Sequence, residues 1–312
     1  MPVFRRASSK VWVILVPVIA ALAGCSNGRL VLALALDPTL LAPPSDARAL
    51  RSTEAAVRGI AAIMAKNFGL PVPGRVTVYL YAGRQAFEQG LIHDADLTPV
   101  RAAELSNFAI GIGLPRQLLL MESGPERSER EWLRLIAHEL THVSQIELAG
   151  GEGRGEQWLA EGMAEWVAFA TLEHLGLDTM SRRRLAATSG IRTHSTLIQA
   201  RLDLEKLGTP RGFTAWHSRE GSLPIYQLAF LIADYLIQRR GLDRVVAYFT
   251  SFTTSRDRHA NFRHALGETL PDFEASVLAH LKATVDLAAT ELPLDASSPA
   301  PGVVAALIPP QG

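Results

Sequence analysis

The sequence is poor in several features that mark particular classes of protein. Its 312 residues contain a single cysteine, Cys25, which excludes an internal disulfide framework and any zinc or iron–sulfur site built from several cysteines. Basic and acidic residues balance at 31 each, so we expect no nucleic-acid partner, since such a partner usually requires a basic surface. Beyond the N-terminal segment, no apolar run reaches the length of about 20 residues that a transmembrane helix needs.

The N-terminal segment, residues 1–24, has the pattern of an export signal. Positive charges come first, followed by the short apolar run Val11–Leu22 and then by small residues. The positive charges belong to Arg5, Arg6 and Lys10. Leu22-Ala23-Gly24-Cys25 then resembles the lipobox of bacterial lipoproteins, in which the cysteine is acylated and becomes the mature N-terminus.

This resemblance implies a lipid anchor at Cys25 and a location in the bacterial cell envelope. The next residue is Ser26, whereas an aspartate would resemble the inner-membrane retention signal, so the outer membrane and its periplasmic face are favoured. A plain secretory signal with a chance cysteine is the alternative. Membrane contact is therefore expected through the anchor alone.

The body of the chain, residues 46–290, is predicted to be mainly helical with a few early strands. Strands are predicted where β-branched and aromatic residues cluster, at Val76–Tyr81, Phe108–Ile112 and Gln117–Met121. Apolar periodicity predicts helices at Asp46–Phe68, Gln85–Gln89, Ser128–Glu147, Gln157–Leu175, Arg182–Ala187, Thr196–Leu207, Tyr226–Arg240, Leu242–Phe252 and Pro271–Leu287. Because strands come early and helices late, the order favours the α+β class.

One motif, on the third of these predicted helices, contains residue types that bind metal ions and transfer protons. Residues 138–142 read His-Glu-Leu-Thr-His, and histidines at i and i+4 project from one helical face, so His138 and His142 can reach a single metal ion. Glu139 lies one position further on, where it can address a metal-bound water without being a ligand. A helix with two ordinary histidines is the alternative interpretation.

The following helix supplies a candidate third ligand. Catalytic zinc sites take three protein ligands and leave a position for water, and two histidines with one glutamate are a standard set. Glu161 lies 19 residues after His142, with a glycine-rich segment between them that suits a turn. Glu165 shares the face of Glu161 and could accept the free ring N–H of a histidine ligand. A solvated acidic stripe is the alternative, but the helix is largely apolar, which favours buried carboxylates with a cation partner.

His-Glu-Leu-Thr-His followed by Trp-Leu-Ala-Glu-Gly-Met-Ala-Glu-Trp at 158–166 closely resembles the gluzincin metallopeptidases, which include thermolysin and the zinc aminopeptidases, and most of all their peptidase MA-like branch. The resemblance covers residues 130–170 and implies a zincin-like fold. It implies that His138, His142 and Glu161 bind Zn²⁺ and that Glu139 is the general base. It also implies that Glu165 is the carboxylate that contacts a histidine ligand from the side away from the metal. It also implies that a sheet edge holds the substrate backbone, for which we expect Gln117–Met121.

A later segment fits the same family. Related proteins carry a tyrosine at the start of a helix after the active-site helices, and in zinc aminopeptidases it polarises the tetrahedral oxyanion. Tyr226 is the candidate here and His217 the substitute, although Tyr226 could equally be a core residue. The Gly-x-Met-Glu-Asn exopeptidase motif is missing, since the chain offers only Met121-Glu122-Ser123. Aminopeptidase activity is therefore not implied.

The sequence thus predicts a lipid-anchored, zinc-dependent peptide-bond hydrolase that acts on a peptide or protein substrate. A non-catalytic envelope binding or assembly module with the zincin fold is the main alternative, and a zinc amidohydrolase acting on cell-wall peptides is the other. The predicted organisation is a signal over 1–24, a tether over 25–45, a peptidase domain over 46–290 and a flexible tail over 291–312. Within the domain we expect a sheet part at 46–125, active-site helices at 126–176 and a helical part at 177–290, and within the tether Leu30–Leu36 could instead pack as a strand.

Overall fold

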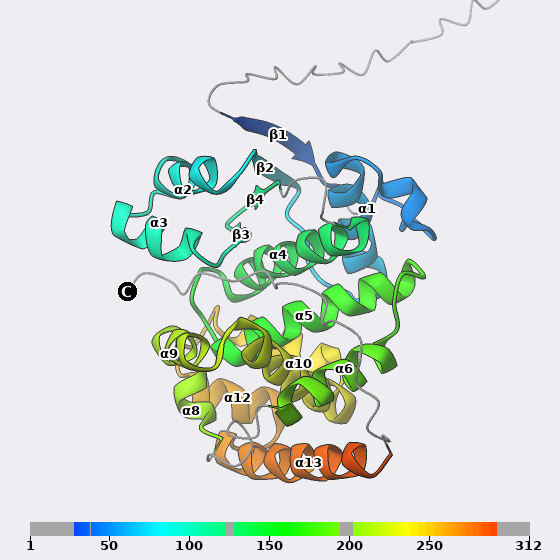
Figure 1. Cartoon of the computed structure of the whole chain (residues 1–312), viewed down its shortest axis with the longest axis vertical. Helices are drawn as coiled ribbons and strands as arrows, with labels where there is room; N and C mark the ends of the chain where they lie inside the picture. The colour runs from blue at the N-terminus through cyan, green and yellow to red at the C-terminus, as the bar shows by residue number, and fades with distance from the viewer. Residues whose placement is uncertain (1–27, 38, 123–127, 194–201, 292–312) are drawn as a thin grey trace, which may run out of the picture.

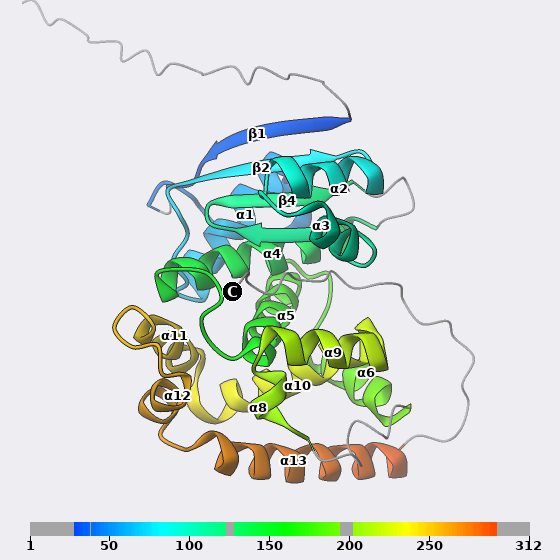
Figure 2. The same ribbon diagram turned by 90° about the vertical axis from the view of Figure 1, so that its left-hand side faces the viewer.

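A computed structural model describes residues 28–37, 39–122, 128–193 and 202–291 (Figure 1). The predicted signal, Cys25, residues 292–312 of the predicted tail and the first half of the helix predicted over Thr196–Leu207 lie outside these residues. The α+β prediction is confirmed. A four-stranded mixed sheet comes first in the chain, and a mainly helical part follows it (Figure 2).

The sheet has the strand order β1-β2-β4-β3, with the bounds β1 Arg29–Ala35, β2 Arg75–Tyr81, β3 Gly111–Leu114 and β4 Gln117–Met121. β1 runs antiparallel to β2, β2 parallel to β4, and β4 antiparallel to β3. For residues 25–45 the sequence allowed either a tether or a strand at Leu30–Leu36. The structure has a strand there, β1, which belongs to the sheet.

The edge strand beside the active-site helix is β3, so the prediction that Gln117–Met121 forms this edge is wrong. β4 lies inside the sheet, between β2 and β3. The physical reason is visible in its composition, because Leu118, Leu119 and Leu120 are all fully buried. A strand covered on both faces has a continuous apolar run, whereas β3 alternates glycine with larger residues.

The helices of the sheet half are the 3-10 turn η1 Ala47–Leu50, α1 Thr53–Asn67, α2 Arg84–His93 and α3 Pro99–Ser106. The single helix predicted over Asp46–Phe68 is divided because Ser52 caps α1, its side chain accepting a hydrogen bond from the backbone N–H of Ala55. The predicted short helix at Gln85–Gln89 lies within the longer α2.

Two long helices follow the sheet and pack against each other, α4 Glu129–Ala149 and α5 Gln157–His174. α4 begins at a capping box between Ser128 and Glu131. It ends at Gly150, whose φ of 66° is the left-handed conformation that favours glycine. Both helices agree with the prediction to within two residues at each end.

The remaining helices form the lower half of the molecule in Figure 1. They are α6 Met180–Thr193, α8 Leu204–Leu207, α9 Pro210–Glu220, α10 Ser222–Arg240, α11 Leu242–Ser251, α12 Arg258–Leu266 and α13 Leu270–Glu291. α10 packs closely on α5, because a Cβ at Gly162 of α5 would lie 2.1 Å from the carbonyl oxygen of Ala229. Within the described residues, no helix is both long enough and apolar enough to cross a membrane.

Candidate metal centre

Helices α4 and α5 bring the three predicted ligands together in the interior. One ligand atom from each of His138, His142 and Glu161 can be chosen so that all three atoms lie within 4.8 Å of one another. His138 and Glu161 are almost completely buried, and His142 is 7% exposed. The i, i+4 spacing on α4 puts the two histidines on one face of that helix, and the packing of α5 on α4 brings the carboxylate of Glu161 next to them.

The donor atoms that face one another lack hydrogen-bond partners among the described residues. They are Nε2 of His138, Nε2 of His142 and Oε2 of Glu161. Polar atoms buried without partners are costly, so such a group needs a ligand to satisfy it. Imidazole nitrogen and carboxylate oxygen are the donors that zinc takes in catalytic sites. The residues therefore fit a metal ion bound as in zinc enzymes.

Two glutamines form hydrogen bonds with candidate ligands, and the sequence analysis did not identify either. Gln145 places Oε1 2.7 Å from Nδ1 of His142 and donates from Nε2 to the backbone carbonyl of Ala160 at 2.9 Å. Gln157 donates from Nε2 to Oε1 of Glu161 at 2.7 Å, which leaves Oε2 for a metal. The available signal was helical spacing, since Gln145 lies three residues after His142 and Gln157 four before Glu161.

Glu165 lies next to His138, the other candidate histidine ligand. Its Oε1 is 3.2 Å from Nδ1 of His138. Arg134, which the sequence analysis missed, donates from Nη2 to both carboxylate oxygens at 2.5 and 2.6 Å. Burial opposes ionisation of Glu165, but the charge of Arg134 outweighs it and lowers the pKa of this carboxyl to about 2. Glu165 is therefore an ionised group next to His138.

Glu139 is completely buried, and neither of its carboxylate oxygens has a hydrogen-bond partner among the described residues. Burial raises its pKa to about 8. The edge strand β3 crosses directly over it, because a Cβ at Gly111 would lie 2.9 Å from Oε1 of Glu139. A Cβ at Gly113 would lie 2.3 Å from the backbone oxygen of Glu139. These two glycines let the strand approach the helix, and the Gly-Ile-Gly pattern was the signal that sequence reasoning passed over.

The pKa values of the two histidines shift in opposite directions. Burial disfavours protonation of His138, but the carboxylates of Glu161 and Glu165 outweigh it and raise the pKa of His138 to about 10. Burial lowers the pKa of His142 well below its usual value, and the neighbouring His138 lowers it further. Without a metal, the positive charge in this site therefore resides on His138. A bound cation would replace that proton and balance the same carboxylates.

Of the two candidate oxyanion donors, Tyr226 lies beside His138, and His217 lies beside Tyr226. Tyr226 is buried in α10, and its ring centroid is 6.2 Å from that of His138. His217 of α9 is one step further away, with its ring centroid 6.2 Å from that of Tyr226. Nε2 of His217 lies 2.6 Å from the hydroxyl of Ser222. Tyr226 is thus the nearer of the two candidates to the histidine ligands.

A scan against protein-family models finds none that matches this chain. A search of curated proteins likewise finds no similar sequence. The interpretation of the site therefore depends on its own geometry.

A pocket opens beside His142, one of the three candidate metal ligands. Its wall includes Gly113 and Leu114 of the edge strand, and Gln145 and Gln157 of the two helices. The glycine-rich segment between α4 and α5 forms another part of the wall. An extended ligand in this pocket would therefore lie beside the edge strand and His142.

Proposed function

We propose that this protein is a zinc-dependent peptide-bond hydrolase. The observation that carries the proposal is the set of unpartnered buried donors on His138, His142 and Glu161 next to Glu139. A structural metal site would account for the three ligands but not for Glu139. A fully buried carboxylate without a hydrogen-bond partner costs stability, and a catalytic role as proton acceptor gives a reason to keep it.

His138, His142 and Glu161 would hold the zinc ion, which would supply Lewis acidity for the scissile carbonyl and lower the pKa of water at the site. Glu139 accepts a proton from the attacking water and later returns it to the leaving amine. Burial raises the pKa of Glu139 above the usual value of a carboxyl group, which favours uptake of a proton by this carboxylate.

The surrounding residues of the chain orient the reaction. Edge strand β3 can add the substrate backbone as a further strand, since its free side has no neighbouring strand in the described sheet. Tyr226 is the proposed donor to the oxyanion, with His217 as the substitute. Gln145 and Gln157 hold His142 and Glu161, and the pair of Arg134 and Glu165 holds His138.

The location of this activity is a separate part of the proposal. The lipobox-like sequence ending at Cys25 supports a lipid-anchored protein of the bacterial cell envelope, with the outer membrane favoured. The substrate would then be a peptide or protein of that compartment. Neither part depends on the other, because a soluble form lacking the signal should retain the same catalytic centre.

The experiment is metal analysis combined with cleavage of a mixed peptide library. Purified protein should contain about one zinc per chain, since three protein ligands complete an open catalytic site. A chelator should abolish cleavage, and added zinc should restore it. His142→Ala should lose metal and activity together, whereas the exposed Gln89→Ala is the matched control and should lose neither. Absence of cleavage at full zinc occupancy would overturn the proposal.

A further inference from the structure

A second hollow adjoins the pocket at the candidate metal centre. The two share the segment Glu152, Gly153, Arg154 and Gly155, which connects α4 to α5. The second hollow is otherwise lined by Phe252, Arg256 and Arg258, from the end of α11 to the start of α12. A ligand that extends past His142 along the shared segment therefore reaches a region lined by three arginines.

Arg154 is the most distinctive residue of this region. It is half-buried, and its Nη1 donates to the backbone carbonyls of Ala149 at 2.6 Å and Phe252 at 3.2 Å. It forms no ion pair with a carboxylate in the described part of the chain. The other half-buried arginines whose partners are described each pair with a carboxylate: Arg29, Arg58, Arg101, Arg130, Arg134, Arg183, Arg184 and Arg258.

The glycines around Arg154 keep its surroundings open. A Cβ at Gly151 would lie 3.0 Å from Nη2 of Arg154, and one at Gly155 would lie 3.0 Å from the ring of Phe249. Gly151 and Gly155 also have φ values of 153° and 105°, which residues other than glycine rarely adopt. The segment therefore presents backbone and one fixed guanidinium to a ligand, with few side chains in between.

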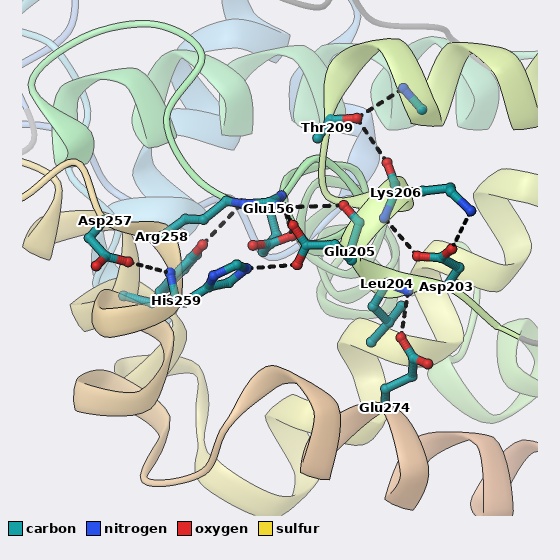
Figure 3. A network of polar contacts seen from close by, with 12 residues as sticks. Glu156, Asp203, Leu204, Glu205, Lys206, Thr209, Asp257, Arg258, His259 and Glu274 are labelled. Carbon is teal, nitrogen blue, oxygen red and sulfur yellow. Dashed lines mark hydrogen bonds and ion pairs between the residues drawn. The ribbon is translucent and has the colours of Figure 1, made fainter.

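The other charged residues that line the second hollow differ in whether they form ion pairs within the protein. Arg258 lies between Glu156 and Glu205 and forms an ion pair with each of them (Figure 3). Arg256 is exposed and has no ion pair among the described residues. The exposed Glu152 is the one acidic residue on the wall. Arg154 and Arg256 are therefore the two positive groups that remain available to an anion.

We propose that Arg154, assisted by Arg256, binds a carboxylate of the peptide substrate. A guanidinium binds carboxylates through charge-assisted hydrogen bonds, and Arg154 is held in place before the ligand arrives. The carboxylate would be either an acidic side chain or the C-terminus of the peptide. This substrate preference rests on the proposed peptidase function, because the pocket is interpreted as the path of the substrate chain.

The test compares matched peptides with the zinc-loaded wild-type protein. One set carries glutamate or glutamine at each position in turn, and a second set carries a free or an amidated C-terminus. Removing the recognised carboxylate should raise KM about 10- to 100-fold, the range for a hydrogen bond to a charged group, with little change in kcat. The set that shows the effect identifies the source of the carboxylate. Equal rates across both sets would overturn the inference and leave the peptidase function standing.

Variants then assign the effect to residues. Arg154→Met should abolish the discrimination between the paired peptides, and Arg256→Gln should weaken it. Arg256 is exposed, so this second variant should fold even if loss of the Arg154 anchor disturbs the segment. Arg84→Met, an exposed arginine of α2, is the matched control and should keep full discrimination.

A binding measurement separates this inference from catalysis. Glu139→Gln protein should bind the carboxylate peptide about 10- to 100-fold more tightly than its neutral partner. The same preference without any cleavage by the wild type would refute the peptidase function while keeping the carboxylate site. Equal dissociation constants would refute the carboxylate site.

Discussion

Replacing Gln145 with leucine should weaken metal binding without removing a ligand. The amide nitrogen of Gln145 donates to the carbonyl of Ala160, which can only accept, so the amide oxygen must face His142. Nδ1 of His142 must then carry its proton, and Nε2 presents its lone pair towards His138 and Glu161. Gln145 thus selects the tautomer that can bind metal.

Loss of such an orienting partner typically costs 10- to 100-fold in metal affinity, which corresponds to about 1.4 to 2.8 kcal/mol. Competition for zinc against a chromophoric chelator measures this change directly. Gln145→Glu should give a smaller loss, since a carboxylate still accepts from His142 but cannot donate to Ala160. Gln89→Leu, an exposed substitution on α2, is the control. Unchanged zinc affinity in a folded Gln145→Leu protein would refute the assignment of Gln145 as the residue that fixes the tautomer.

Three further changes test other parts of the account. Tyr226→Phe should lower kcat by about 10²- to 10³-fold with little change in KM if its hydroxyl donates to the oxyanion, and unchanged turnover would turn attention to His217. Gly162→Ala places a methyl group 2.1 Å from the carbonyl oxygen of Ala229, so thermal denaturation should show a loss of about 1–3 kcal/mol. Cys25→Ser should abolish fatty-acid labelling and membrane fractionation, and persistence of both would contradict the lipobox interpretation.

The sequence predicted those parts of the site that depend on spacing within one helix. His138, Glu139 and His142 follow from the helical repeat, as do Glu161 and Glu165 on the next helix. A turn rich in glycine between the two helices made their meeting expected, and the structure brings the three ligand atoms within 4.8 Å. The order of strands and helices was enough for the α+β class.

The parts that escaped prediction depend on contacts between elements. Arg134 and Gln145 are ordinary residues of an amphipathic helix until packing places Glu165 and the carbonyl of Ala160 beside them. Helices α9 and α12 were not predicted, because both are short and rich in polar residues and neither contains a long apolar run. The sheet edge was assigned to the wrong strand because a buried leucine run was preferred over the glycines of β3.

Glu139→Gln tests the central claim most directly, because it removes the capacity to accept a proton and preserves the size of the side chain. The variant should fold and keep one zinc per chain. It should lose at least the 10²- to 10⁴-fold in turnover that general acid–base catalysis usually supplies. The measurement is peptide cleavage at matched zinc content, together with rescue of a deletion strain by the same variant. Lost cleavage and lost rescue support the hydrolase, whereas full activity and full rescue by Glu139→Gln would contradict it even if every metal ligand proved correct.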